Sequence, residues 1–182
     1  TANLSSLTRS TVGGQTISST VIEEWERLSG APLLELWGMT ELSGLGTTHP
    51  FYAPNVHNSI GVALPGTQVK VASFDDASTE TPAGVPGELM VRGPLVTMGY
   101  YNNEKATAET IEPDGWLHTG DVATHDGLGH FFVVDRLKDM ILTGGYNVYP
   151  AEIERVMIGH EAVALVGVGR GPDGVKGEVA HA

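Results

Sequence analysis

Apolar and polar residues alternate in short segments along much of this chain, a pattern typical of β-strands rather than of long helices. Val69, Val71 and Ser73 alternate with polar neighbours, and the segment 131–134 is an unbroken run of aromatic and β-branched residues. Loops rich in Gly, Pro and Asp separate such segments. The predicted strands are 33–36, 69–73, 88–92, 131–134 and 162–168.

Helical spacing occurs first in the segment 20–28. Thr20 and Glu23 have the spacing of a capping box, and Gly30 can end the helix. Its apolar face consists of Val21, Trp25 and Leu28.

Two shorter helices are predicted further along the chain. Asn103 can cap a helix over 104–110, and Pro150 suits the first turn of another. The apolar stripe of the second one is Ile153, Val156 and Met157.

The segment 129–154 combines a strand, a charged joint, a glycine turn and a helix. Charged residues crowd 135–139, and Gly144 and Gly145 follow, where the backbone can take conformations closed to other residues. This order predicts a joint between two structural units with a ligand bound near it. The segment 44–65 is loop-rich with weak periodicity, which favours a functional loop.

Composition narrows the class of protein. The chain has 182 residues, enough for one large domain or slightly more, and 41% of them are hydrophobic, enough for a core. With 22 acidic against 10 basic residues the formal charge is −12, so nucleic acid is not an expected partner, although a small anion could bind locally. There is no cysteine, no run of the ~20 apolar residues that span a membrane, and no signal-peptide core, so we predict a cytoplasmic protein.

The chain is expected to be a fragment. The first residues give no clear helix start, and the predicted strand 162–168 has little after it that could cover it.

Thr40 and Glu41 place a hydroxyl beside a carboxylate directly after a predicted strand, where ligands commonly meet an α/β sheet. The carboxylate could hold Mg²⁺, which prefers oxygen ligands and substrate phosphates. From these two residues alone, a helix cap followed by a first-turn acid is the simpler interpretation. Trp37 could stack on a planar ring, although a single Trp is more often part of a core.

Three further residues are candidates for ligand binding or domain motion, and each also has an ordinary structural interpretation. Asp121 could accept hydrogen bonds from a ribose diol, or it could be a turn aspartate. Arg136 could bind the same sugar or a phosphate, or form a surface ion pair with Asp135 or Asp139. Lys138 could be a hinge or an ordinary exposed lysine.

The seven histidines have no metal-ligand spacing. His118 and His130 are interpreted as structural or solvated, whereas His49 and His57 lie in the long loop and could line a pocket.

In combination and in this order, five motifs resemble the adenylate-forming superfamily of acyl- and aryl-CoA synthetases, adenylation domains and luciferases. The motifs are GGQ at 13–15, LWGMTE at 36–41, GVPGELMVRGPLVTMGYYN at 84–102, GWLHTGD at 115–121 and VVDRLKDMILTGGYNVYPAEIE at 133–154. They span nearly the whole chain.

The resemblance assigns the nucleoside end of ATP to two motifs. Gly13, Gly14 and Gln15 match the segment beside adenine and the acyl pocket. Trp37 takes the place of a ring, usually Tyr, that packs against adenine, and Gly38 follows it.

The same resemblance implies roles for four polar residues. Thr40 matches the residue near the α-phosphate, and Glu41 the carboxylate that holds Mg²⁺. Asp121 matches the aspartate that binds ribose, and Arg136 its partner.

Lys138 matches the pivot between a large and a small domain, and Gly144 and Gly145 match the loop that borders the pantetheine channel in the second half-reaction. The implied chemistry uses ATP, Mg²⁺ and CoA. A carboxylic acid attacks ATP and gives an acyl-adenylate, and the thiol of CoA then displaces AMP.

The implied fold is mixed α/β. Residues 1–137 would end the large domain, with a β-rich subdomain at about 60–135, and 138–182 would begin the small one. The phosphate loop of the family would lie upstream of Thr1 and its C-terminal lysine beyond Ala182, so the chain alone is expected to be inactive.

We therefore predict part of an ATP-dependent ligase that joins a fatty or aromatic acid to CoA. The alternatives are an adenylation domain that loads a carrier protein and a non-catalytic nucleotide-binding module. The sequence gives no indication of the oligomeric state or of the particular acid.

Overall fold

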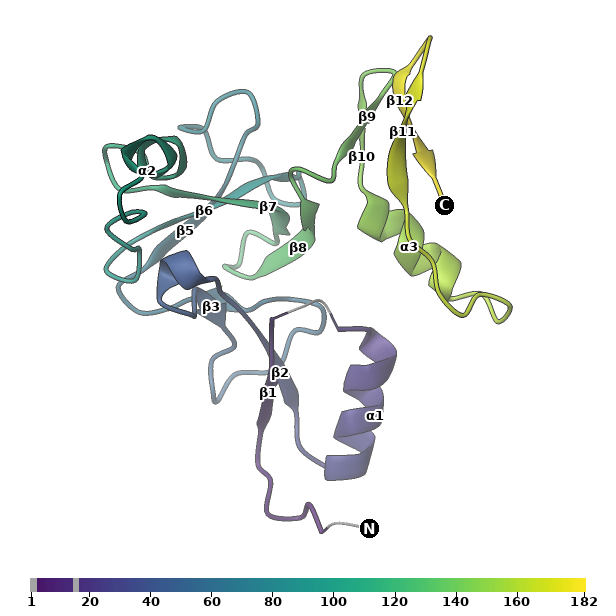
Figure 1. Cartoon of the computed structure of the whole chain (residues 1–182). Coiled ribbons are helices and arrows are strands. Elements are labelled where there is room, and N and C mark those ends of the chain that lie inside the picture. Colours follow the sequence, from purple (N-terminus) through teal and green to yellow (C-terminus); the bar gives the residue numbers. More distant parts are fainter. Residues whose placement is uncertain (1–2, 15–16) are drawn as a thin grey trace.

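The computed structural model describes residues 3–14 and 17–182 and forms a mixed α/β fold with three sheets (Figure 1). In chain order the elements are β1 (Ser10–Val12), α1 (Ser19–Ser29), β2 (Leu33–Trp37), the 3₁₀ helix η1 (Thr40–Leu42), β3 (Thr47–Thr48), β4 (Val62–Ala63), β5 (Gln68–Ala72), β6 (Gly87–Arg92), α2 (Glu104–Thr110), β7 (Leu117–His125), β8 (Phe131–Arg136), β9 (Ile141–Thr143), β10 (Tyr146–Val148), α3 (Pro150–Ile158), β11 (Gly169–Asp173) and β12 (Gly177–His181).

The first sheet has the strand order β1-β2-β3-β4, and only β1 and β2 are parallel. Helix α1 begins one residue earlier than predicted, because Ser18, rather than Thr20, is the N-cap and accepts the amide of Val21. Gly30 ends the helix in a left-handed conformation (φ 69°), as expected. The predicted helix and the strand after it are thus confirmed, and they place the end of β2 beside the central sheet.

The central sheet, β5-β6-β7-β8, is antiparallel throughout and confirms the predicted strands at 69–73, 88–92 and 131–134. Its inward side chains pack into two buried clusters together with Ile60 of the preceding loop and Leu42 of η1. The first contains Ile60, Val71, Leu89, Ala123 and Phe131, and the second contains Leu42, Val91 and Leu117. Trp37 packs against both clusters, so the end of the first sheet is fixed against the central one.

The segment predicted as a functional loop, 44–65, is a structural connection at its C-terminal end. Ile60 donates its amide to the carbonyl of Phe131 (2.9 Å), and Phe131 donates its amide to Gly61 (3.0 Å). The Oγ of Ser59 also donates to the Phe131 carbonyl. These bonds join the loop to β8 of the central sheet.

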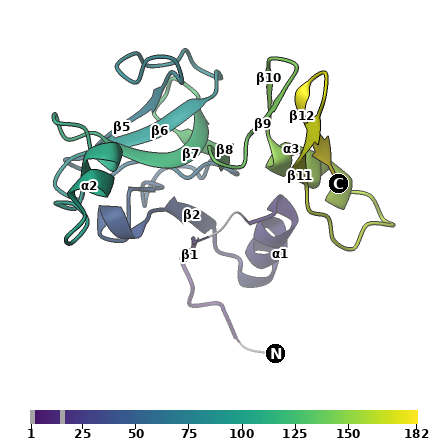
Figure 2. The ribbon, with the colours of Figure 1, turned by 45° about the horizontal axis from the view of Figure 1, so that its top comes forward.

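The C-terminal sheet has the order β10-β9-β12-β11 (Figures 1 and 2). The strand predicted at 162–168 is wrong: this segment is irregular, and its Val168 amide is donated to the Glu154 carboxylate instead of to a neighbouring strand. The strands lie just after it, because Asp173 accepts two amides and closes a tight turn between β11 and β12. An Asp-Gly pair such as 173–174 favours a turn between two strands, and here the strands form on either side of it rather than over the apolar run.

A short turn after β8 connects the central sheet to the C-terminal sheet, which stands beside it in both views (Figures 1 and 2). Across this turn the Ala151 amide, at the start of α3, donates to Oδ2 of Asp135 (3.0 Å). A carboxylate at a helix N-terminus is electrostatically favourable, so this bond holds α3 against β8. No helix in the described part of the chain is long and apolar enough to cross a membrane.

Candidate nucleotide site

A polar cavity of about 180 Å³ lies where the end of β2 meets β7 and β8. Its walls come from the two sheets, from the loop after β1 and from the loop between β3 and β4. The residues that line it are Val12, Gly14, Glu35, Leu36, Trp37, Gly38, Asn58, Ile60, Asp121, Val133 and Arg136. Five of the predicted site residues therefore meet here, although they are scattered over more than a hundred positions of the sequence.

Asp121 is the polar centre of this cavity. Its Oδ2 accepts a hydrogen bond from Trp37 Nε1 at 2.8 Å. Its Oδ1 forms an ion pair with Arg136 Nε, also at 2.8 Å. The residue is only 3% exposed, and this burial raises the pKa of its carboxyl group, against the lowering influence of Trp37 and Arg136. The turn-aspartate interpretation is wrong, and so are the surface ion pairs suggested for Arg136, whose partner is Asp121.

An irregularity between β6 and β7 aims Asp121 at the cavity. Glu88 pairs with Val122, and Met90 pairs with His118, so one residue of β6 faces three residues of β7. The hydroxyl of Thr119 donates to the Leu89 carbonyl (2.6 Å) inside this bulge. Such bulges redirect side chains, which explains how a strand residue comes to point into the pocket.

Trp37 is the last residue of β2, and its indole ring stands between the cavity and the core. A Cβ at Gly46 would touch this ring, and a Cβ at Gly38 would overlap the carbonyl oxygen of Gly44. The two glycines let the chain return closely past the tryptophan. An aromatic face beside a carboxylate suits a planar base attached to a diol.

Glu35 is a pocket residue that the sequence analysis missed. Burial raises the pKa of its carboxyl group, while the amide of Asn58 and the charge of His57 lower it. The available signal was the strand period: residues two apart point to the same face, so Glu35 had to share a face with Trp37.

Thr40 and Glu41 open η1, directly after the cavity wall, but neither lines the cavity. The cap interpretation is wrong for Thr40, since Met39 is the N-cap and no side chain caps this helix. Tyr100 donates its hydroxyl to Oε1 of Glu41 (2.8 Å), and this bond raises the pKa of the phenol, with burial acting in the same direction. Glu41 does lie in the first helical turn, as that interpretation required.

The residues present fit a magnesium ion that binds mainly through substrate. Within residues 3–14 and 17–182 there is no group of three or more His, Cys, Asp or Glu that could hold a metal. Mg²⁺ commonly uses one or two carboxylates together with substrate phosphates, and Glu41 with the exposed hydroxyl of Thr40 offers such an incomplete set.

The remaining predicted residues in the described part of the chain are not among those that line the cavity. Lys138 is exposed in the turn after β8, and its carbonyl accepts a hydrogen bond from Arg170. Gly144 and Gly145 are exposed in the turn between β9 and β10 and have positive φ angles of 57° and 85°, which explains the glycine pair. Gly13 packs against Leu36.

Gln15 lies outside the described residues. His118 and His130, interpreted above as structural or solvated, both bond to carboxylates: His118 to two glutamates and His130 to Asp126. His49 is buried and faces the carbonyl of Ser59, and neither it nor His57 lines the cavity.

The architecture is that of the adenylate-forming enzymes, with the pocket at the meeting of two sheets. The family model described as AMP-binding enzyme matches residues 1–101, more than half of the chain, and this chain belongs to that family.

Two relatives and one solved structure indicate the range of similarity. A long-chain-fatty-acid–CoA ligase of Escherichia coli O6:H1 is 45% identical over 97% of this chain and 31% of its own length. A feruloyl-CoA synthase of an Amycolatopsis species is 41% identical over 100% of this chain and 36% of its own. The structure of o-succinylbenzoate CoA synthetase from Bacillus subtilis, in complex with ATP and magnesium ion, has a TM-score of 0.80 at 35% identity and covers 94% of this chain and 35% of that one. The chain thus spans about a third of the length of these relatives.

Proposed function

We propose that the protein containing this chain is an ATP-dependent ligase that joins a fatty or aromatic carboxylic acid to CoA through an acyl-adenylate. The proposal rests on the buried Asp121 carboxylate, which Arg136 and Trp37 hold in a cavity whose polar and aromatic lining suits a nucleoside. The two relatives named above, a fatty-acid and an aryl-acid CoA ligase, support the reaction class.

The pocket would bind adenosine through three side chains. An ionised carboxylate has about four acceptor positions, and Trp37 and Arg136 use one on each oxygen of Asp121, so positions remain for a ribose diol. The indole face of Trp37 would stack on adenine, and the carboxylate of Glu35, two residues earlier on the same strand face, would accept its exocyclic amino group. Gly13, Gly14 and Gln15 are proposed to flank the base.

In the first half-reaction the acid carboxylate attacks the α-phosphorus of ATP and pyrophosphate leaves. Thr40 would donate its hydroxyl to the α-phosphate, where negative charge increases in the transition state. Glu41 would hold Mg²⁺, which neutralises the charge of the leaving pyrophosphate, and Tyr100 would orient that carboxylate.

In the second half-reaction the CoA thiol displaces AMP. We propose that residues 1–137 and 138–182 belong to two domains that change orientation about Lys138 between the steps. The exposed turn at Gly144 and Gly145 would then approach the adenylate. The bond between Asp135 and Ala151 spans the proposed pivot, so it would exist in only one of the two orientations.

Two other functions predict different chemistry. An adenylation domain would transfer the acyl group to a carrier protein rather than to CoA, and a degenerate binding module would hold the nucleotide without reaction. Against the second stands the joint presence of Thr40, Glu41, Asp121, Arg136 and Lys138. A cytoplasmic location stays a prediction, in keeping with a cysteine-free composition.

The test uses the longest open reading frame that contains this chain, with ATP, Mg²⁺ and a panel of fatty and aryl acids. Acid-dependent pyrophosphate release, with acyl-CoA formed only when CoA is added, is the expected result. Pyrophosphate release without acyl-CoA would refute the CoA ligase and favour an adenylation domain that loads a carrier protein. A folded protein that binds adenosine but releases no pyrophosphate with any acid would refute the ligase and favour the binding module.

A further inference from the structure

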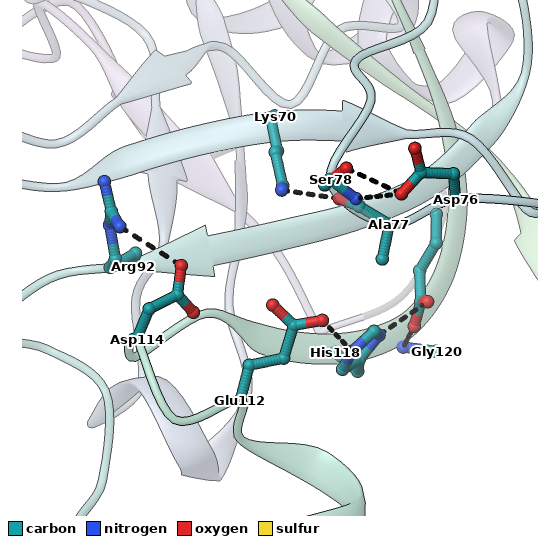
Figure 3. A network of polar contacts seen from close by, with 10 residues as sticks. Lys70, Asp76, Ala77, Ser78, Arg92, Glu112, Asp114, His118 and Gly120 are labelled. Atoms are coloured by element: carbon teal, nitrogen blue, oxygen red, sulfur yellow. Dashed lines mark hydrogen bonds and ion pairs between the residues drawn. The ribbon is translucent and has the colours of Figure 1, made fainter.

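Outside the cavity, His118 of β7 lies between two carboxylates (Figure 3). Its Nδ1 is 2.8 Å from Oε2 of Glu88 on β6, and its Nε2 is 3.2 Å from Oε1 of Glu112, in the loop before β7. All three side chains are less than half exposed. The arrangement joins two strands of the central sheet through one imidazole ring.

Both ring nitrogens of His118 must donate in this arrangement. An ionised carboxylate only accepts hydrogen bonds, whereas a neutral imidazole has just one N–H group. A ring that faces carboxylates on both sides is therefore the imidazolium cation. Burial by itself lowers the pKa of His118, but the hydrogen bonds and charges of Glu88 and Glu112 outweigh it and raise that pKa above its usual value.

Glu88 carries the effect of His118 to the nucleotide pocket. Its second oxygen, Oε1, accepts the backbone amide of Gly120 at 3.1 Å. Gly120 lies in the bulge between β6 and β7 with a φ of 70°, where the strand ladder leaves its amide without a backbone partner on β6. On its other side the Gly120 carbonyl accepts the amide of Leu137 (2.8 Å). The next residue is Asp121, so the glutamate fixes the peptide that presents the pocket carboxylate.

The charges of these groups also indicate that His118 affects Asp121 through Glu88. The negative charge of Glu88 raises the pKa of Asp121, after the larger influence of burial, and so disfavours the ionised form that accepts hydroxyl groups. A cation at His118 partly neutralises Glu88. Loss of that cation would leave a glutamate with excess charge close to Asp121, free to turn away from the Gly120 amide.

The other charged groups near this network have partners of their own. Lys70 of β5 donates to the Ala77 carbonyl, and Arg92 pairs with Asp114 (Figure 3). Lys70 also lies over the Trp116 ring, and Arg92 donates to Gln68. In the described part of the chain, Glu88 and Glu112 are the charged groups that bond to His118.

If the cavity binds a nucleoside as proposed above, we propose that His118 is a positioning residue for that site. Its imidazolium holds Glu88, Glu88 holds the Gly120 amide, and the bulge so fixed presents the ionised Asp121 to the ribose hydroxyls. His118 touches no substrate and acts through Glu88.

The experiment measures the affinity for adenosine between pH 5.5 and 9 by calorimetry on the complete protein. Adenosine is the probe because, unlike AMP, it carries no phosphate that titrates in this range. The wild-type affinity is expected to decrease as the pH rises through the raised pKa of His118, and His118→Gln to weaken binding at pH 6 by roughly five- to tenfold and to remove this pH step. His130→Gln is the matched control, since His130 also pairs with a carboxylate, Asp126, but not with one near the pocket.

A rescue separates positioning from mere folding. Adding Glu88→Gln to His118→Gln removes the uncompensated charge but keeps an amide oxygen for Gly120, so affinity is expected to recover at least twofold relative to His118→Gln. In the ligase assay, His118→Gln should raise the KM for ATP with little change in kcat. If His118→Gln does not fold, the pH step of the wild type and its loss in Glu88→Gln decide instead.

The outcomes distinguish the two proposals. A folded wild type that binds no adenosine at any pH would refute the nucleoside site itself. A wild type that binds adenosine, with no pH step above pH 6.5 and with affinity unchanged in His118→Gln, would overturn the role of His118 and leave the site intact.

Discussion

Replacement of Trp37 by Phe tests the central contact of the pocket. Phenylalanine keeps an aromatic ring for stacking and packing but has no N–H group, so the 2.8 Å bond to Oδ2 of Asp121 is lost. The carboxylate remains buried, at 3% exposure, with Arg136 as its remaining side-chain partner in the described residues. Trp37→Phe therefore isolates one hydrogen bond to one charged group.

The size of the effect follows from that bond. A hydrogen bond to a charged group contributes about 1.5–3 kcal/mol. The Trp37 bond stabilises the ionised carboxylate and lowers the pKa of Asp121, so its loss should raise that pKa further and destabilise the ionised form by a similar free energy. Because the folded-state pKa of this acid is already above its unfolded value, the ionised group destabilises the fold at high pH, and this cost disappears as the pH falls below the unfolded value. The stability lost in Trp37→Phe should accordingly be largest near neutral pH and smaller in acid.

Two measurements follow on the complete protein: adenosine affinity from pH 4.5 to 8, and urea unfolding at pH 7 and pH 5. The acid limb of binding should move to higher pH in Trp37→Phe, because the carboxylate that accepts the ribose hydroxyls is then harder to ionise. Trp25→Phe is the matched control, because Trp25 Nε1 is buried without a partner in the described residues and its removal breaks no bond. An acid limb that coincides in the wild type and in Trp37→Phe would refute the assigned role of the indole N–H.

Three further changes test other contacts. Asp135→Asn keeps an acceptor for the Ala151 amide but removes the charge at the start of α3, which should weaken that contact by about 0.3–1 kcal/mol and change the rate ratio of the two half-reactions in single-turnover assays. An unchanged ratio would exclude this bond as part of the reorientation. Tyr100→Phe frees Glu41 and should change the Mg²⁺ dependence of pyrophosphate release by less than tenfold, with stability within about 0.5 kcal/mol in urea unfolding; no change in Mg²⁺ dependence would argue against a metal at Glu41. Gly38→Ala should destabilise by about 1–3 kcal/mol in the same unfolding assay, because its Cβ overlaps the Gly44 carbonyl, and wild-type stability would contradict this close approach.

Local sequence signals predicted most of the fold. The alternation at 69–73, the apolar run at 131–134, the Asn103 cap and Pro150 at the first turn of α3 all act within a few residues, and all are confirmed. The strand predicted at 162–168 is wrong, because an apolar run alone does not determine which acceptors its backbone amides will bind. The cap at Ser18 rather than Thr20 is a smaller error of the same kind.

The site was predictable only in part from the sequence. Trp37 and Asp121 are far apart along the chain, and the motifs that resemble a known family, not their spacing, grouped them in advance. The link between Glu88 and Gly120 depends on a register change between β6 and β7 that leaves no mark in either strand's alternation. Glu35 could have been predicted as a pocket residue from the two-residue period of the strand, because it lies two positions before Trp37.

The charges of the cavity indicate which part of a nucleotide it can recognise. Glu35 and Asp121 bring two carboxyl groups to the cavity wall and Arg136 one cation, so the cavity does not favour a polyphosphate electrostatically. A neutral nucleoside is compatible with these carboxylates, because its amino and hydroxyl groups are donors. In the proposed ligase the phosphates would be bound elsewhere: by Mg²⁺ at Glu41, by a hydrogen bond from the Thr40 hydroxyl, and by groups from the two thirds of the relatives' length that this chain does not span. Under the proposed function, a strongly acidic chain with a formal charge of −12 can belong to an enzyme of a polyanionic substrate, because it would supply only the nucleoside end of the site.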